Sequence, residues 1–245
     1  MTGEICRGIG RLMSEARERG RRLARRLDDL LDDAITGRST RLRPFAAGHQ
    51  ELRTRLAELE ARTRFSLVNM QSRWRTDPAQ RQRPLDQNSL DRGVRVTLFV
   101  PRSVLGRSPL LPSMHPDLWI APVVQDAMLV DDVLAILPGD LDSDGALSLW
   151  LTMDAELVAD VRSIRDALLA EGRRAQDITG AAPLNARQLE IALALARGDK
   201  DTSTARRLNV SLRTVEREVS VVLGHLGVSS RHDATLAILG EHPVH

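Results

Sequence analysis

The chain has 245 residues, enough for two or three small domains, and a formal net charge of only +2, which by itself calls for no polyanionic partner. Its single cysteine, Cys6, excludes an intrachain disulfide, and no apolar run approaches the length of a membrane span. The first residues are too charged for a signal peptide, so the composition predicts a soluble, cytoplasmic protein without membrane contact.

The sequence predicts a helical N-terminal region over residues 1–63. A long helix is expected over 8–35, where Leu23, Leu27, Leu30 and Ala34 recur at four- and three-residue spacing. After a polar break at 36–44, a second helix is expected to begin near Phe45 and continue to Thr63. Each helix has an apolar seam, which predicts a partner helix either within the chain or across a dimer.

Residues 64–175 predict an α/β sandwich. Short alternating runs bounded by Pro, Gly and Asp indicate strands at 65–70, 94–100, 118–124, 127–130, 133–137 and 147–151. Helical segments are expected at 85–92 and 155–175, and loops at 77–84 and 101–116. A short linker over 176–182 follows.

This middle part resembles the phospholipase D-like sensor domain of some regulators. The resemblance rests on four stretches, 91–96, 117–122, 128–132 and 133–138. It implies a module for effector sensing or dimerisation, with an unknown small molecule as the effector. Catalytic members of that family use a His followed two residues later by Lys. Here Lys200 is the only lysine and Gly198 stands two residues before it, so that phosphodiesterase mechanism is excluded.

The segment 183–245 predicts a four-helix domain. Asn185 with Gln188 forms a capping box, and Leu184 with Leu189 occupies the hydrophobic-staple positions. Gly198 predicts the end of the first helix, and Asp201 is the expected cap of the second. Asn209 suits a left-handed turn, after which Ser211 begins a third helix that Gly227 ends. Ser230 with Asp233 opens a fourth. Two short helices joined at 208–211 are typical of a helix-turn-helix.

From Leu184 to Arg231 the chain resembles the LuxR/FixJ-type DNA-binding domain without a gap. The matching residues are Leu184, Arg187, Glu190, Ala196, Gly198, Ala205, Arg206, Leu208, Ser211, Thr214, Val215, Val219, Leu223, Leu226, Gly227, Val228, Ser230 and Arg231. The resemblance implies a bacterial transcriptional regulator that binds double-stranded DNA and contacts RNA polymerase.

The chain departs from that family where its recognition helix should be most basic. Glu216, Arg217 and Glu218 stand where the family has Lys or Arg, a variable residue and His. The surface from Arg213 to Ser220 is therefore expected to carry no net positive charge, which weakens phosphate contact. Glu and Arg can still read cytosine and guanine. The predicted DNA-contacting residues are Arg213, Thr214, Glu216, Arg217 and Ser220.

No other motif indicates an enzyme, a metal or a cofactor. Residues 140–145 match half of a calcium loop, but Leu151 replaces the required acid, so a hairpin turn is expected instead. His242 and His245 lack a third ligand nearby. Walker, GxGxxG and Gly-x-Ser-x-Gly motifs are absent from the sequence.

The sequence thus predicts a multidomain regulator that binds specific DNA as a homodimer. Its predicted parts are N-terminal helices, a non-catalytic central α/β sandwich and a C-terminal four-helix helix-turn-helix domain. An alternative is a regulator impaired in DNA binding that sequesters a partner protein, suggested by Glu216 and Glu218.

Overall fold

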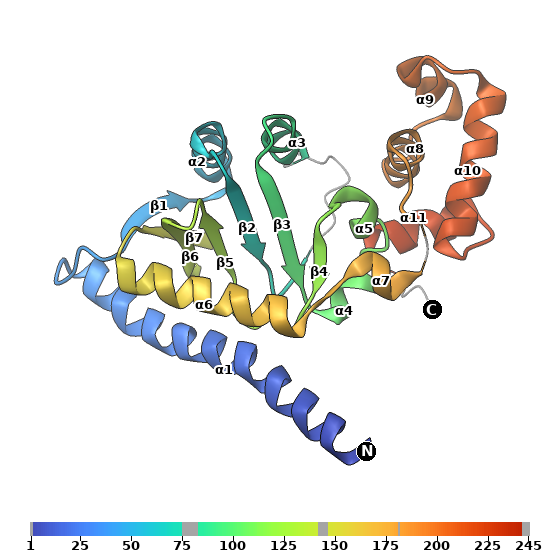
Figure 1. Cartoon of the computed structure of the whole chain (residues 1–245). Coiled ribbons are helices and arrows are strands. Elements are labelled where there is room, and N and C mark those ends of the chain that lie inside the picture. The colour runs from blue at the N-terminus through green and yellow to red at the C-terminus, as the bar shows by residue number, and fades with distance from the viewer. Residues whose placement is uncertain (1, 75–82, 142–146, 181, 242–245) are drawn as a thin grey trace. The chain divides into compact units, whose positions relative to one another are not determined.

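The computed structural model describes residues 2–74, 83–141, 147–180 and 182–241, which divide between two compact units (Figure 1). Unit 1 comprises Met1–Ser72, Gln82–Val100 and Trp119–Arg173. Unit 2 comprises Arg73–Arg81, Pro101–Leu118 and Arg174–His245, as far as these are described. Each unit has a hydrophobic core of its own.

A mixed sheet organises unit 1. Its strands are β1 (Arg43–Ala47), β2 (Ser66–Met70), β3 (Arg95–Val100), β4 (Leu118–Ile120), β5 (Ala127–Val130), β6 (Leu134–Leu141), β7 (Leu147–Thr152) and β8 (Arg173–Arg174). They lie in the order β1-β7-β6-β5-β2-β3-β4-β8. Strands β2 and β3 are parallel, whereas β5, β6 and β7 form an antiparallel meander beside β2.

One face of the sheet is covered by two long helices, α1 (Thr2–Ile35) and α6 (Ala155–Glu171) (Figure 1). The α1 residues Leu23, Leu27 and Leu30 are buried in one cluster with Val161 and Leu168 of α6. The same cluster contains sheet residues from β2, β3, β5 and β6. The first predicted seam is therefore buried within the chain, against α6 and the sheet.

The opposite face is covered by α2 (His49–Arg62) and α3 (Arg83–Asp91) (Figure 1). Leu52, Leu56 and Leu59 of α2 pack against Phe45 and Ile136 of the sheet. The second predicted seam is thus also buried within the chain. The prediction that Phe45 begins a helix is wrong, because Arg43–Ala47 pairs with β7 as the edge strand β1.

The predicted separate N-terminal region 1–63 differs from the structure. Strand β1 and helices α1 and α2 all belong to the unit that contains the sheet. A sheet whose two faces are both apolar needs a helical layer on each side. The N-terminal helices supply these layers, together with α6 and α3.

The strand predictions agree with the structure except in length, most visibly at β4, which ends at Ile120. The predicted loop at 101–116 contains two short helices, α4 (Arg102–Leu105) and α5 (Leu111–Met114). The predicted linker at 176–182 contains α7 (Ala175–Thr179). Most of the half-matched calcium loop lies outside the described residues, and β6 and β7 pair on either side of it. In the described part of the chain, no helix is long and apolar enough to cross a membrane.

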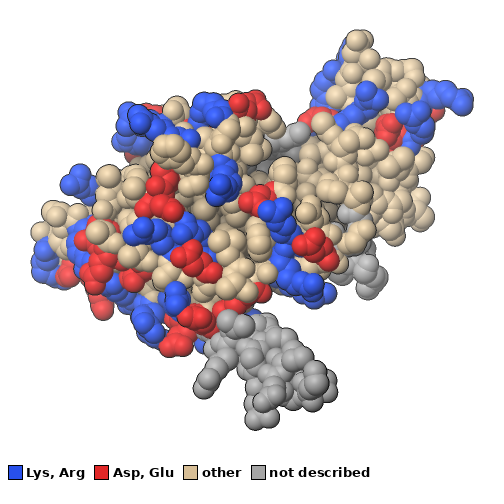
Figure 2. Space-filling model, in the orientation of Figure 1, with Lys and Arg blue, Asp and Glu red and all other residues tan. Residues whose placement is uncertain are grey.

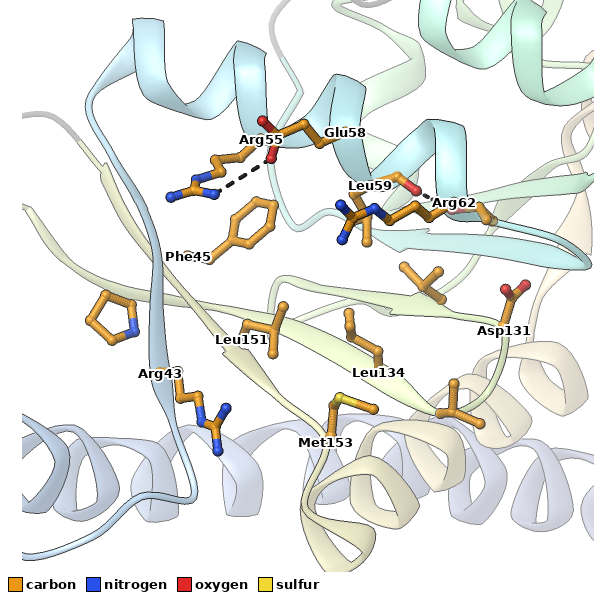
Figure 3. Close-up of a pocket in the computed structure, with 14 residues that line it drawn as sticks. Arg43, Phe45, Arg55, Glu58, Leu59, Arg62, Asp131, Leu134, Leu151 and Met153 are labelled. Carbon is orange, nitrogen blue, oxygen red and sulfur yellow. Dashed lines mark hydrogen bonds and ion pairs between the residues drawn. The ribbon is translucent and has the colours of Figure 1, made fainter.

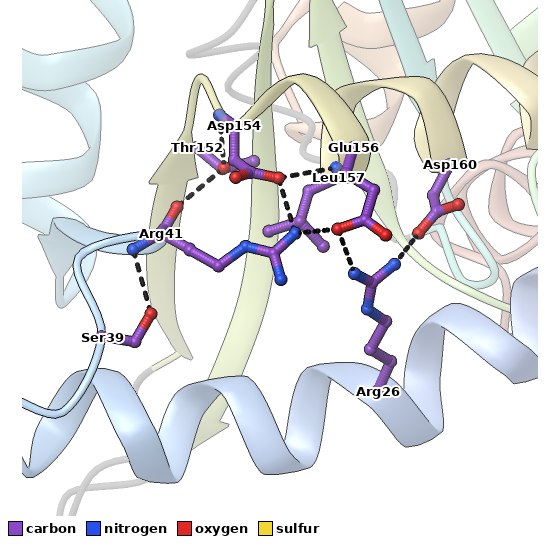
Figure 4. A network of polar contacts seen from close by, with 8 residues as sticks. All are labelled: Arg26, Ser39, Arg41, Thr152, Asp154, Glu156, Leu157 and Asp160. Carbon is purple, nitrogen blue, oxygen red and sulfur yellow. Dashed lines mark hydrogen bonds and ion pairs between the residues drawn. The ribbon is translucent and has the colours of Figure 1, made fainter.

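Two arginines tie the N-terminal segments to the start of α6 (Figure 4). Arg41, just before β1, donates to Asp154 at 2.7 Å and to Glu156 at 2.5 Å. Arg26 of α1 contacts Glu156 at 2.8 Å and Asp160 at 2.6 Å. Asp154 also caps α6 by accepting from the backbone N–H of Leu157 at 3.0 Å. The hydrogen bond from Arg41, followed by that from Leu157, lowers the pKa of Asp154 to about 2.

A second carboxylate, that of Asp131, organises the turn between β5 and β6. Asp131 and Asp132 have φ of 49° and 59°, as in a type I′ turn. The Asp131 carboxylate accepts the backbone N–H groups of Arg64, Phe65 and Ser66 at 2.9, 2.7 and 2.9 Å. Partial burial acts to raise the pKa of Asp131, but these hydrogen bonds outweigh it and hold the pKa below its ordinary value.

We expect Asp131→Asn to lower the free energy of unfolding by about 1–3 kcal/mol, because one amide cannot replace a carboxylate that accepts three backbone N–H groups. Asn tolerates the left-handed backbone, so the change isolates the carboxylate. The matched control is Asp132→Asn at the neighbouring left-handed position, which removes one partly exposed ion pair with Arg165 and no backbone hydrogen bond, so it should cost less. Urea denaturation followed by circular dichroism measures the free energy of unfolding of both variants. Equal losses in the two variants would contradict this role of Asp131.

We expect Asp154→Asn to reduce stability at neutral pH by about 1 kcal/mol, discounted for solvent screening of the ion pair. Asn is as good a cap as Asp, so only the charge is removed. Because folding depresses the pKa of Asp154 from 3.8 to about 2, its stabilisation is present above pH 3.8 and is lost as the pH falls towards 2.

The difference between the native chain and Asp154→Asn should therefore shrink across that interval in urea denaturations at several pH values. The control Asp29→Asn removes an exposed carboxylate of α1 that has no ion pair among the described residues. A difference that stays constant from neutral pH down to pH 2 would rule out the Asp154 ion pair as its source.

Candidate nucleic-acid interface

The candidate interface lies on the helical part of unit 2, which contains α8 (Ala186–Ala196), α9 (Asp201–Leu208), α10 (Leu212–Leu226) and α11 (Arg231–Leu239). Their shared core includes Leu189, Leu193, Val215, Val222 and Ile238. Leu110 and Met114 from the α5 region also pack in this core, and Ser113 accepts the N–H of Leu184 at 2.9 Å. The helical domain predicted over 183–245 therefore draws on an earlier segment as well.

The residues that cap and end the helices are the predicted ones, with one exception. Asn185 and Gln188 form a complete capping box, with two hydrogen bonds of 3.0 Å. Ser211 caps α10 by accepting from the N–H of Thr214 at 3.1 Å. The exception is α9, where Lys200 occupies the cap position. Asp201 is the first helical residue and forms a bidentate pair with Arg231 at 2.6 and 2.5 Å.

The connection between α9 and α10 is a tight turn. Asn209 adopts φ 52° and ψ 49°, the left-handed conformation that the sequence predicts for it. The N–H of Val210 then bonds to the carbonyl of Ala205 at 3.0 Å. These contacts determine how α10 leaves α9, which is the geometry on which a helix-turn-helix depends.

Helix α10 has one buried and one exposed side. Val215, Val219 and Val222 are buried, and Leu226 closes the same stripe. The five predicted DNA-contacting residues lie away from it: Arg213, Glu216, Arg217 and Ser220 are exposed, and Thr214 is half-buried. The Ser220 hydroxyl donates to the Glu216 carbonyl at 3.2 Å, and the Thr214 hydroxyl lies 2.8 Å from that of Ser211.

Glu218 does not lie on this exposed side, although the sequence predicts that it does. Its side chain is only 9% exposed, and it accepts from Gln188 of α8 at 3.0 Å and from Arg217 at 2.8 Å. The hydrogen bond from Arg217 is the main cause that holds the pKa of Glu218 below its ordinary value, and that from Gln188 adds to it. Glu216 is therefore the acidic side chain that this stretch of α10 exposes.

Several further cations lie on or next to helices α8, α9 and α10. Arg187, Lys200, Arg206 and Arg213 are exposed and have no ion pair among the described residues. Arg207 instead contacts Asp199 at 3.2 Å. Figure 2 shows Lys and Arg side chains around this part of the surface, interrupted by a few acidic ones. Of these four residues, the sequence predicts only Arg213 as a DNA contact, because the fold decides which cations form ion pairs.

Within the described residues, no group of three His, Cys, Asp or Glu side chains could hold a metal ion. His115 of unit 2 lies edge-on to Trp74, with ring centroids 5.3 Å apart. Burial lowers the pKa of His115 to about 4. A half-buried, neutral imidazole in an aromatic contact has a packing role.

No protein-family model and no curated protein sequence matches the chain. Among solved structures, TrmBL2, an archaeal chromatin protein described with a novel mode of DNA binding, gives a TM-score of 0.42 at 12% identity over 71% of this chain and 70% of its own. Nuc from Salmonella typhimurium, a phospholipase D family member, gives a TM-score of 0.42 at 12% identity, over 54% of this chain and 97% of its own. NucT from Helicobacter pylori gives a TM-score of 0.40 at 13% identity, over 54% of this chain and 99% of its own. Similarities this low assign neither a family nor an activity to the chain.

We expect Glu218→Ala to lower the free energy of unfolding of the helical unit by about 1–3 kcal/mol, because Gln188 and Arg217 both lose their acceptor. The matched control is Glu216→Ala, two residues earlier on the same helix, which removes an exposed carboxylate and should change stability little. Thermal unfolding followed by circular dichroism and amide exchange in α8 and α10 measure the effect. If both variants unfold like the native chain, Glu218 does not hold α8 to α10.

Proposed function

We propose that the chain is a sequence-specific DNA-binding transcriptional regulator that inserts α10 into the major groove. The observation that carries the proposal is the division of α10 into a buried valine stripe and an exposed side with Arg213, Glu216, Arg217 and Ser220. Its support from the sequence is the ungapped resemblance to LuxR/FixJ-type domains over 184–231. A capped helix after a short left-handed turn is the element that reads bases in such proteins.

The charges around α10 suit a polyanion better than the sequence implied. Burial of Glu218 leaves only one of the two glutamates, Glu216, on the surface that would repel DNA phosphates. Arg187, Lys200 and Arg206 are free to contact phosphates, which supply most of the non-specific affinity of DNA-binding proteins. Arg213 and Arg217 can then read guanine, and Glu216 can accept from cytosine. Arg217 must exchange its contact with Glu218 for the base.

The alternative function, sequestration of a partner protein, rested on Glu216 and Glu218 together. Only Glu216 is exposed, so the acidic surface that would disfavour DNA is reduced to one side chain. We therefore retain DNA binding as the leading function and treat sequestration as the outcome if α10 does not contact DNA.

We further propose that the regulator binds DNA as a homodimer, because one helix-turn-helix contacts only one half-site. The two N-terminal seams do not provide the dimer surface, since both are packed within unit 1. The sheet unit is proposed to sense an effector or to set the dimer geometry, without catalysis by the His-x-Lys mechanism. Contact with RNA polymerase belongs to the same proposal.

We expect Arg217→Ala to cost about 1–3 kcal/mol on the specific DNA site and to relax preference at one base pair. Glu216→Lys should raise affinity for all DNA and steepen the salt dependence by about one unit, because a new cation releases one more counterion. If Glu216 also reads cytosine, the same variant should lose discrimination at one position. Sites selected from random DNA, followed by salt-titrated anisotropy, provide the measurement.

The control Arg162→Ala removes an exposed arginine from α6 in the other unit and should leave DNA affinity unchanged. Should the Arg217 and Glu216 variants both bind specific and random DNA like the native chain, α10 does not enter the groove. Sequestration of a partner protein would then be the better function.

A further inference from the structure

Unit 1 contains a cavity of about 430 Å³ between α2 and the sheet (Figure 3). This volume lies within the range of small-molecule sites. The cavity lies between α2 and the sheet edge where β1 pairs with β7, and strands β1, β5, β6 and β7 together with α2 contribute residues to its wall.

The inner wall of the cavity is apolar. Phe45 of β1, Leu134 of β6, Leu151 of β7 and Leu59 of α2 face its interior (Figure 3). Phe45 is buried, but the other three side chains are only partly buried, so the cluster has apolar surface that no other described part of unit 1 covers. Met153 at the edge of the cavity is 66% exposed. Its apolar side chain is flexible and can adapt to a ligand.

The polar groups around the cavity leave an excess of positive charge. Glu58 pairs with Arg55 at 3.5 Å, and the Asp131 carboxylate is occupied by three backbone N–H groups. Arg43 and Arg62 also line the cavity, and neither has an ion pair or side-chain hydrogen bond with any described residue. In Figure 3 the guanidinium of Arg62 lies beside the cavity below α2, and that of Arg43 lies on its other side.

We propose that this cavity binds a small organic monocarboxylate, with its hydrocarbon body on the Phe45, Leu134 and Leu151 wall and its carboxylate at Arg62. An arginine presents a planar fork that matches a carboxylate in a bidentate pair. The apolar wall excludes a hydrophilic anion such as inorganic phosphate as the preferred ligand, because that ion would leave the wall uncovered. The free Arg43 strengthens the positive potential at the opening.

An organic monocarboxylate would then be the effector that the proposed function leaves open. Only the effect of the ligand on DNA rests on the proposed function. Binding itself concerns the sheet unit, whose cavity is lined entirely by residues of that unit.

The test is calorimetric titration of the full chain with octanoate and 2-naphthoate, each beside its neutral primary amide. We expect saturable binding of the two carboxylates, at least about tenfold tighter than that of the amides, because a charge-assisted hydrogen bond is lost in the amides. Arg62→Gln should abolish this preference and weaken carboxylate binding about tenfold. Arg53→Gln, an exposed arginine on the same helix that does not line the cavity, should bind like the native chain.

Met153→Gln tests the apolar wall, and its exposure makes the change safe for folding. It should weaken both the carboxylates and the amides. No saturable carboxylate binding, equal affinity for acid and amide, or unchanged binding in Arg62→Gln would each overturn the proposal. DNA affinity measured on the same samples separates the two ideas. Loss of carboxylate binding with DNA binding intact overturns the cavity site alone, whereas carboxylate binding without DNA binding supports it and overturns the proposed function.

Discussion

The burial of both faces of one mixed sheet is the constraint on which unit 1 depends. The sheet residues Met70, Phe99, Leu129 and Leu137 are almost fully buried, which requires a helical layer on that side. Helix α6 alone is too narrow for this, so α1 lies beside it and contributes its leucine stripe to the same cluster. Arg26 of α1 and Arg41 before β1 form ion pairs with the N-terminal turn of α6, which hold these N-terminal segments to that helix.

The second face is covered less completely, and this difference creates the cavity. Helix α2 packs on β1 and the meander through residues that remain partly exposed, whereas the leucines of α1 are deeply buried. Apolar side chains that are left partly uncovered next to unpaired arginines form an amphiphilic recess. Such a combination suits a ligand that is itself apolar at one end and anionic at the other.

The helical unit depends on a different kind of interaction. Its helices are short, and short helices are marginal unless their ends are capped and one side is buried. Asn185, Ser211 and Ser230 provide side-chain caps, and Asn209 and Gly227 provide left-handed ends. Glu218 adds a buried polar link between α8 and α10, so the residue that seemed to oppose DNA instead holds the candidate recognition helix in place.

The sequence by itself determined the local features of this protein, because caps, left-handed positions and hydrophobic spacing act over a few residues. It predicted the strands of the meander, the capping box at Asn185 and the turn at Asn209. Only the tertiary structure decided which surfaces are paired. The stretch around Phe45 became an edge strand because β7 offered a free hydrogen-bonding edge, although its apolar spacing also fits a helix. Glu218 turned inward because Gln188 lies beside it. Among the described residues, the fold brings no carboxylate into an ion pair with Arg43 or Arg62. These outcomes depend on contacts between segments far apart in the chain, which no local pattern contains.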